Sequence, residues 1–140
     1  MIYPDTSFLF SRYLTDSHSV EVDRRMAARP RIIVTTFHRA ELANAIFQWV
    51  FRGKTSVLQA ELAFADFEAD CTLGVWQLVG VPEMAYDICA KLARQHAPTL
   101  GVRTLDTLHV AAALELKATR FWTFDGRQAK LAEVEGLTTS

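Results

Sequence analysis

The chain has 140 residues and a mass of 15.7 kDa, the size of one ordinary globular domain. Hydrophobic residues make up 50% of the sequence and charged residues 22%, a balance that excludes a disordered or fibrous protein. The 15 Lys and Arg residues nearly balance the 16 Asp and Glu residues, so the formal net charge is -1. No overall positive field recruits nucleic acid or an acidic membrane, and a polyanion has to be held by a local site. We expect a single domain over residues 1–140.

Along the chain, short apolar segments typical of strands alternate with longer segments typical of helices. In order, the pattern predicts a strand at 1–4, helices at 6–14 and 18–28, a strand at 31–35, helices at 36–52 and 55–71, a strand at 75–81, helices at 83–96 and 104–118, a strand at 120–124, a helix at 127–134 and a last strand near Leu137. This alternation is typical of an α/β domain with a central parallel sheet. In such sheets, ligands bind at the carboxyl ends of the strands.

The sequence also predicts a soluble cytoplasmic protein. Its two cysteines, Cys71 and Cys89, are too few for a disulfide scaffold or a zinc finger, and we expect both to be small buried side chains. The start of the chain lacks the basic and long apolar stretches of a signal peptide. No apolar run is long enough for a membrane span.

Two acidic residues follow predicted strands directly. Asp5 ends the first strand and Asp125 ends the strand at 120–124, and each precedes a predicted helix. One interpretation is that each caps its helix by accepting backbone N–H bonds, and Gln128 would complete a capping box with Asp125. The other is that both carboxylates meet at the edge of the sheet where sites form.

Asp106 lies in the first turn of a predicted helix whose segment 108–114 is apolar apart from His109. The helix dipole stabilises a carboxylate at this position. A carboxylate on an apolar helix is nevertheless costly unless a cation meets it. The two interpretations, dipole stabilisation and a functional site, remain open for this residue alone.

Glu41 belongs to a polar arc on the predicted helix at 36–52. The arc consists of His38, Glu41, Asn44, Gln48 and Arg52. A solvent-facing helix side explains such an arc, and the alternative is that its amino-terminal end borders a cleft. The remaining acids lie in mixed polar segments, and we expect them on the solvated surface.

Taken together, these four acids predict a metal site. Four carboxylates that converge without a cation repel one another, so a cluster requires hard divalent ions. Oxygen ligands without Cys or paired His favour Mg²⁺ or Mn²⁺ over zinc. Such a site suits in-line phosphoryl chemistry, in which one metal activates water and another stabilises the leaving oxygen.

The segments around these acids resemble the four motifs of a PIN domain. They are Asp5-Thr6-Ser7-Phe8-Leu9, the segment His38-Arg39-Ala40-Glu41-Leu42, the segment 101–109 with Asp106, and Thr123-Phe124-Asp125-Gly126-Arg127. More narrowly, the chain is similar to the VapC-type ribonuclease toxins of prokaryotic toxin–antitoxin pairs. Each motif alone is weak, but their order and spacing over nearly the whole chain make the set specific.

The resemblance implies a three-layer α/β/α fold with a central parallel sheet and a Mg²⁺-dependent endoribonuclease site, in which Mn²⁺ substitutes. It implies that Asp5 and Asp106 are the main metal ligands and that Glu41 acts directly or through metal-bound water. Asp125 would complete the acidic pocket and hold a second ion. None of the four acids is replaced in this sequence.

The resemblance extends to supporting residues and partners. Ser7 and Thr123 match small hydroxyl positions that support the carboxylates. Arg103 and Arg127 flank the motifs and would contact RNA phosphate, with surface salt bridging as the alternative. VapC members usually form homodimers and are silenced by a VapB antitoxin whose tail covers the site. We therefore expect an RNA substrate, a homodimer, a VapB-type antitoxin and no membrane partner. Pro4 departs from the pattern, because an ordinary strand residue usually precedes the first Asp.

Several alternatives remain at this point. The Arg-rich segment 24–31 is either a solvated helix end or a phosphate-binding rim beside the acidic site. A receiver-like switch would need an adjacent acid pair after the first strand, and a phosphatase would need an acid where Ser7 stands. A non-catalytic PIN-like module that binds RNA or protein is the main competing function.

Overall fold

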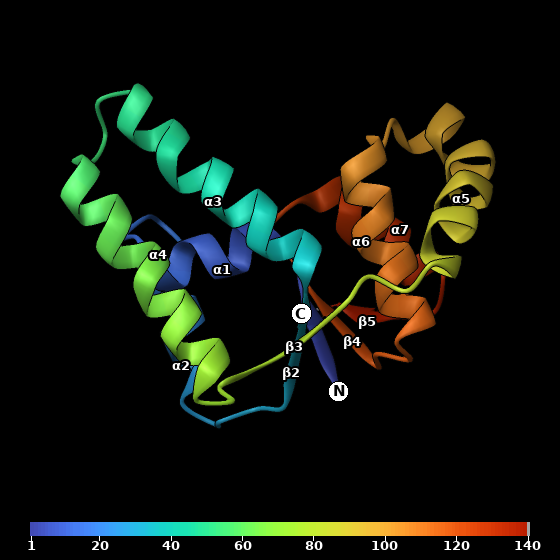
Figure 1. The fold of residues 1–140 in the computed structure, drawn as a ribbon. Coiled ribbons are helices and arrows are strands. Elements are labelled where there is room, and N and C mark those ends of the chain that lie inside the picture. The colour runs from blue at the N-terminus through green and yellow to red at the C-terminus, as the bar shows by residue number, and fades with distance from the viewer. Residues whose placement is uncertain (140) are drawn as a thin grey trace.

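The computed structural model describes residues 1–139, which form a five-stranded parallel sheet flanked by seven helices (Figure 1). The strands are β1 (Ile2–Pro4), β2 (Ile32–Thr35), β3 (Trp76–Val79), β4 (Arg120–Trp122) and β5 (Thr138–Thr139). The helices are α1 (Thr6–Tyr13), α2 (Ser19–Met26), α3 (Thr36–Phe51), α4 (Val57–Thr72), α5 (Met84–Leu100), α6 (Thr104–Glu115) and α7 (Gly126–Val134). The predicted α/β class with a parallel sheet is confirmed.

The strand order β3-β2-β1-β4-β5 places β1 at the centre of the sheet. Ile2 of β1 pairs with Ile32 on one side and with Arg120 on the other, so the three central strands run in register. Their carboxyl ends therefore lie side by side. The residues that follow β1, β2 and β4 are thereby brought to one edge of the sheet.

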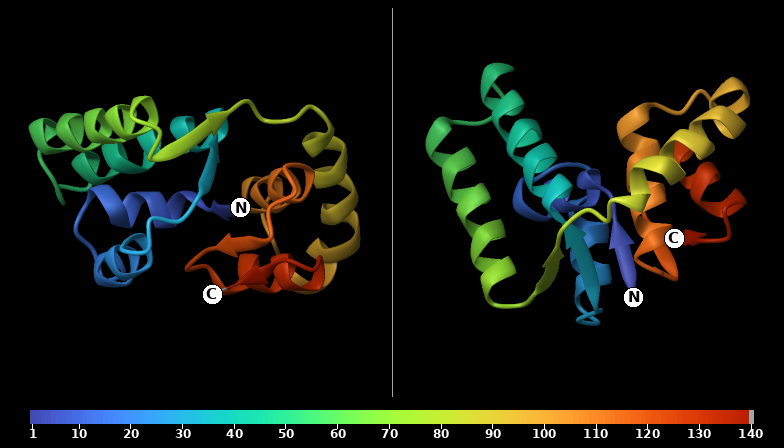
Figure 2. Two further views of the ribbon diagram at one scale, coloured as in Figure 1. Left: turned by 90° about the horizontal axis from the view of Figure 1, so that it is seen from below. Right: turned by 45° about the vertical axis from the view of Figure 1, so that its right-hand side comes forward.

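Two hydrophobic cores cover the two faces of the sheet and produce three layers. Alternate side chains of a strand point to opposite faces, so Ile32 and Val34 pack with α1 to α4, whereas Ile33 packs with α5 to α7. Figure 2 shows these two helix groups on either side of the sheet. Both faces are covered, as expected for parallel strands.

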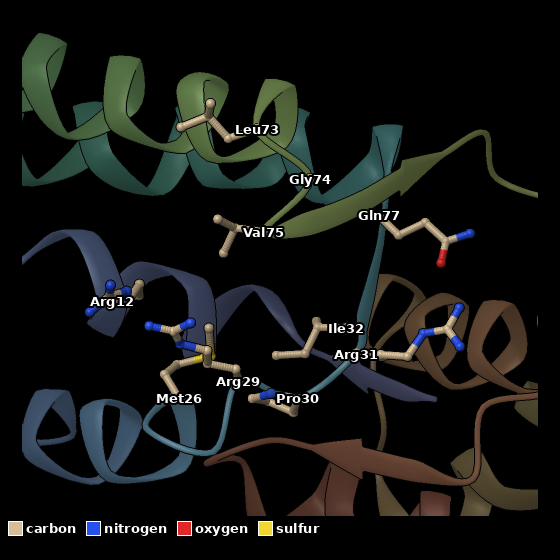
Figure 3. A pocket seen from close by; sticks show the side chains of 10 residues that line it. All are labelled: Arg12, Met26, Arg29, Pro30, Arg31, Ile32, Leu73, Gly74, Val75 and Gln77. Atoms are coloured by element: carbon tan, nitrogen blue, oxygen red, sulfur yellow. The ribbon is translucent and has the colours of Figure 1, made fainter.

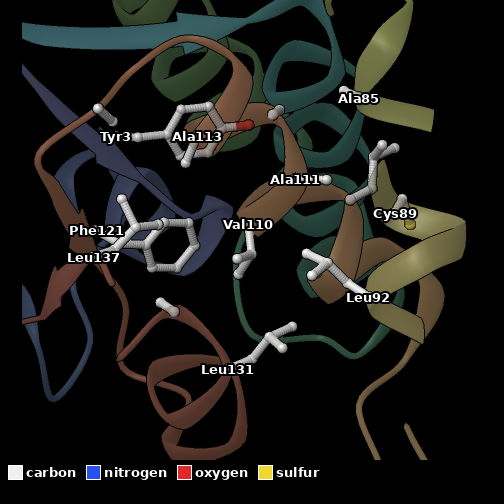
Figure 4. Packing of buried hydrophobic residues seen from close by; sticks show 14 of the residues in the cluster. Tyr3, Ala85, Cys89, Leu92, Val110, Ala111, Ala113, Phe121, Leu131 and Leu137 are labelled. Atoms are coloured by element: carbon white, nitrogen blue, oxygen red, sulfur yellow. The ribbon is translucent and has the colours of Figure 1, made fainter. Parts of the chain in front are cut away.

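Helix α6 is buried along nearly its whole length. Every residue from Thr107 to Ala113 is buried, and the small side chains of Ala111, Ala112 and Ala113 let neighbouring elements approach closely. Figure 4 shows this helix between Leu92 of α5, Leu131 of α7 and the stacked rings of Tyr3 and Phe121. The packing fixes α6 against the sheet, and with it the side chains of its first turn.

Several element boundaries differ from the predictions. Helix α5 continues past the predicted end at 96 to Leu100, with Pro98 inside its last turn, and Gly101 ends the helix in the left-handed conformation at φ 63°. Strand β3 is shorter than the predicted 75–81, and the last strand begins just after Leu137. The predicted domain extends to Ser140, which lies outside the described residues.

Some expectations about burial were wrong. Cys89 is buried as predicted, but Cys71 is only partly buried. Asp16 and Asp70, expected on the solvated surface, are half-buried and accept hydrogen bonds from Ser11 at 2.7 Å and Tyr13 at 2.7 Å. Within residues 1–139, no helix combines the length and the apolar character that crossing a membrane requires.

Candidate active site

All four acids singled out in the sequence line one small pocket at the carboxyl edge of the sheet. The pocket has a volume of about 170 Å³ and is lined by Asp5, Thr6, Ser7, Glu41, Arg103, Asp106, His109, Asp125 and Gln128. Asp5 directly follows β1, Glu41 lies near the start of α3 after β2, and Asp125 lies just beyond β4. Asp106 comes from the first turn of α6. Four segments that are far apart in the sequence thus contribute one carboxylate each.

Asp5 is the most enclosed of these acids, with 6% of its surface exposed. Its Oδ1 accepts hydrogen bonds from the Ser7 hydroxyl at 2.6 Å and from the Phe8 backbone N–H at 3.0 Å. The capping interpretation is therefore correct for one oxygen, while the residue also faces the pocket. Burial raises the pKa of Asp5, although the hydrogen bonds from Ser7 and Thr123 oppose that rise.

The Thr123 hydroxyl connects the first and fourth motifs directly, and the third motif through Gln128. It lies 2.7 Å from Oδ2 of Asp5 and 2.8 Å from Oε1 of Gln128, and it accepts the backbone N–H of Asp125 at 2.9 Å. Gln128 in turn donates from Nε2 to the backbone carbonyl of Asp106 at 3.1 Å. Because Gln128 is 1% exposed, this network is shielded from water and fixes the relative positions of the acids.

Glu41 is held by a second network. Its Oε2 accepts a hydrogen bond from the Thr6 hydroxyl at 2.6 Å and contacts Nε2 of His109. Because the carboxylate accepts, Nε2 carries a proton, and Nδ1 lies 3.1 Å from the Tyr3 hydroxyl. Burial opposes ionisation of Glu41, but His109, Thr6 and the charge of Arg103 together lower its pKa below the ordinary value.

Buried His38 links the ends of β1 and β2 next to Asp5. Its Nδ1 accepts the Thr35 backbone N–H at 2.9 Å, which leaves Nε2 to donate to the Pro4 carbonyl at 2.8 Å. Burial lowers the pKa of His38 well below its ordinary value, so the ring is neutral. Pro4, the departure noted in the sequence, stays within β1, where its carbonyl receives this bond.

Asp106 and Asp125 are more accessible to solvent. Asp106 forms a salt bridge with Arg103, whose Nε lies 3.0 Å from Oδ2 and whose side chain is 79% exposed. Asp125 caps α7 by accepting from the backbone N–H groups of Arg127 and Gln128. Arg103 lines the acidic pocket, whereas Arg127 is not among its lining residues.

The donor set of the pocket suits a hard divalent cation. Its acidic groups are carboxylates, hydroxyl groups of Thr6 and Ser7 lie beside them, and none of the described residues that line it is a cysteine. Within residues 1–139, no three His, Cys, Asp or Glu side chains are arranged to hold one ion. Asp106 is instead paired with Arg103, and Glu41 with Thr6 and His109. A cation would have to draw these carboxylates away from their present partners.

Arg24, Arg29 and Arg31 of the Arg-rich segment 24–31 do not line the acidic pocket. Arg24 pairs with Glu21, while Arg29 and Arg31 line a separate pocket of about 800 Å³ with Arg12 (Figure 3). Arg31 directly precedes β2, so this pocket lies at the amino end of that strand. The alternative of a phosphate-binding rim beside the acids is therefore wrong for Arg29 and Arg31.

Part of the site is not predicted by the sequence. Thr6 gives no signal of its own, because only its neighbour Ser7 matches a family position, and the sequence predicts only a capping role for Gln128. His109 lines the pocket and contacts Glu41, a residue 68 positions away in the sequence. The sequence does offer one signal for this contact: His109 is a polar residue on the apolar helix α6, and a buried polar group requires a hydrogen-bond partner.

The model of the PIN domain family matches residues 2–134. This chain belongs to the PIN domain family. No curated protein sequence matches it. The four acids that line the pocket lie in the segments that resemble the family's motifs.

Several solved structures are similar to the chain. Mycobacterium tuberculosis VapC20, described as a sarcin-ricin loop cleaving toxin, has a TM-score of 0.73 at 16% identity, covering 93% of this chain and 94% of that one. FitAcB from Neisseria gonorrhoeae has a TM-score of 0.69 at 15% identity, with coverage of 99% and 96%. VapBC2 from Rickettsia felis, solved with a DNA fragment from its promoter, has a TM-score of 0.64 at 17% identity, with coverage of 100% and 98%. The chain therefore shares its fold with these three structures over nearly its whole length.

Proposed function

We propose that this PIN-domain protein is a Mg²⁺-dependent endoribonuclease that acts in the cytoplasm as the toxin of a VapBC-type toxin–antitoxin pair. The observation that carries the proposal is the convergence of Asp5, Glu41, Asp106 and Asp125 on one pocket. Similarity in fold to VapC20 and to the VapBC2 toxin–antitoxin protein supports the narrower assignment.

In this proposal Asp5 and Asp106 are the principal ligands of the metal ion, and Asp125 completes the acidic pocket and holds a second ion. Bound Mg²⁺, or Mn²⁺ in its place, supplies positive charge to the scissile phosphate and lowers the pKa of a water molecule. Ser7 and Thr123 donate to the two oxygens of Asp5 and so hold its carboxylate in one orientation.

Glu41 contributes a further negative group whose lowered pKa keeps it ionised. Thr6 and His109 hold that carboxylate at the rim of the pocket. Arg103 lines the pocket beside Asp106, and its exposed guanidinium would bind a phosphate oxygen of RNA. Arg127, in the first turn of α7, binds an RNA phosphate farther from the acidic pocket.

A VapB-type antitoxin and a second copy of the chain are the proposed protein partners. Large apolar side chains remain exposed on several helices, including Phe51 at 88%, Leu62 at 56% and Tyr86 at 57%. Exposed apolar side chains of this size favour protein contacts. Sedimentation of the purified chain measures the dimer, and co-expression with the product of an adjacent short reading frame tests the antitoxin.

Cleavage of RNA by the purified protein tests the enzymatic proposal. Total RNA is incubated with Mg²⁺, with Mn²⁺ or with excess EDTA, using the wild type and the variants Asp5→Ala and Asp106→Ala. Asp66→Ala, which removes an exposed carboxylate on α4, is the matched control. We expect discrete metal-dependent products from the wild type and the control, and none from the two pocket variants.

Two results would contradict the proposal. Absence of cleavage by folded, metal-loaded protein across varied RNAs would favour the non-catalytic binding module. Cleavage that survives both Asp5→Ala and Asp106→Ala would indicate a contaminating nuclease.

A further inference from the structure

A second groove opens directly from the acidic pocket. It has a volume of about 870 Å³, within the usual range for ligand pockets. Thr6, Ser7, Arg103 and Asp125 line both cavities, so the two adjoin. Helices α1 and α3, which lie side by side in Figures 1 and 2, form its walls together with the segment after β4. A polymer held at the acids has to pass through this groove or leave directly into solvent.

One wall of the groove presents an aromatic stack. The rings of His18 and Phe124 are parallel within 8°, with centroids 4.1 Å apart. Phe124 is supported from behind by Phe8 and by the guanidinium of Arg25, 5.8 Å from its centre. His18 is exposed, so its outer face is open to a further ring. Phe124 is thus packed against other side chains of the protein, while His18 is exposed to solvent.

The polar arc of α3 also lines the groove. Asn44, Gln48 and Arg52 line the groove, and they follow Glu41 at intervals of three or four residues on one helix face. Asn44 and Gln48 are exposed, and neither side chain has a hydrogen-bond partner among residues 1–139. The arc extends from Glu41 to Arg52 over about 16 Å of helix. It therefore leads away from the acidic pocket and ends at a positive charge.

We propose that this groove binds single-stranded nucleotides next to the scissile phosphate and sets which bases are accepted there. A nucleobase stacks on His18, the amides of Asn44 and Gln48 bond to base edges, and Arg52 binds a backbone phosphate. The inference deepens the proposed nuclease function and rests on it for the position of the scissile phosphate.

The chemistry of the groove favours RNA over a peptide segment. Open ring faces and amides that both donate and accept match unstacked bases, which offer a π-face and polar edges. Among residues 1–139, the only acid that lines the groove besides Asp125 is Asp16, and its oxygens already accept from the Ser11 hydroxyl and the His18 backbone N–H. The groove therefore offers polar edge readout beside a supported aromatic surface.

Fluorescence anisotropy of a short labelled single-stranded RNA of mixed sequence, measured in EDTA, tests the groove without cleavage. We expect His18→Ala to weaken binding by about fivefold or more, since base stacking on an aromatic ring is worth at least about 1 kcal/mol. His18→Phe keeps a ring and restores affinity. Gln48→Ala weakens binding of some base sequences more than others, whereas Gln95→Ala, an exposed glutamine on α5, has no effect. Thermal unfolding confirms that each variant is folded.

The outcomes separate this inference from the nuclease proposal. Wild-type cleavage of RNA with unchanged affinity in His18→Ala and Gln48→Ala would overturn the groove assignment while the nuclease function stands. Weakened binding in both variants without wild-type cleavage would support the groove and contradict the nuclease. Equal weakening by Gln95→Ala would show non-specific binding and overturn the groove assignment.

Discussion

Replacing Thr123 by Val tests whether one hydroxyl holds the acidic site together. Val keeps the shape of Thr and removes only the polar contacts. The hydroxyl accepts the Asp125 N–H and donates its single proton to Asp5 or to Gln128, so two hydrogen bonds are lost at any moment. A net hydrogen bond is worth about 0.5–1.5 kcal/mol, which gives a loss in unfolding free energy of about 1–3 kcal/mol.

Urea denaturation in EDTA measures this loss. With a slope of about 2 kcal/mol per molar urea, the midpoint of Thr123→Val falls by about 0.5–1.5 M. Thr72→Val is the matched control, since its hydroxyl is exposed and bonds only to the Glu68 carbonyl on the same helix. The control shifts unfolding free energy by less than about 0.5 kcal/mol. Equal midpoints for wild type and Thr123→Val would refute the role of this hydroxyl.

Three further changes have predictable effects on stability. Burial keeps His38 neutral in the folded protein, whereas the same side chain in the unfolded chain takes up a proton below pH 6.5. The unfolding free energy therefore falls by up to about 1.4 kcal/mol per pH unit below that value. Urea titrations at several pH values measure this loss. Asp5 gives a pH dependence of the opposite sign, because its pKa is raised in the folded state. In EDTA, its contribution to the unfolding free energy falls as pH rises above 3.8. Asp5→Asn removes that dependence and raises the melting temperature at neutral pH, while it abolishes cleavage. Phe67→Ala empties a fully buried position and lowers the unfolding free energy by about 3–5 kcal/mol. Phe51→Ala, at an 88% exposed position, lowers it by less than about 0.5 kcal/mol. Similar losses for the two variants would contradict the placement of the core.

The order of elements and the sheet class could be predicted from local patterns. Apolar runs such as Ile32-Ile33-Val34 and the helical spacing between them are properties of adjacent residues, and they suffice for an α/β assignment. The exact ends of helices and strands could be predicted less well from these local patterns. The end of α5 depends on Gly101 adopting a positive φ rather than on Pro98 stopping the helix.

The acids of the site could be found because each occupies an unusual local position. Asp5 and Asp125 follow strands, and Asp106 opens an apolar helix. The contacts that orient these acids could not be predicted from the sequence, because they join residues that are distant in the chain. Examples are the hydrogen bonds between Thr6 and Glu41 and between Thr123 and Asp5. No local pattern encodes such pairs.

The most direct test of a shared metal site is calorimetric titration of metal-free protein with Mn²⁺. We expect saturable binding by the wild type and by Asp66→Asn, an exposed position on α4, and affinity at least about tenfold weaker in Asp106→Asn and in Asp5→Asn. Equal Mn²⁺ affinity in all four proteins would contradict the claim that these carboxylates act on one cation.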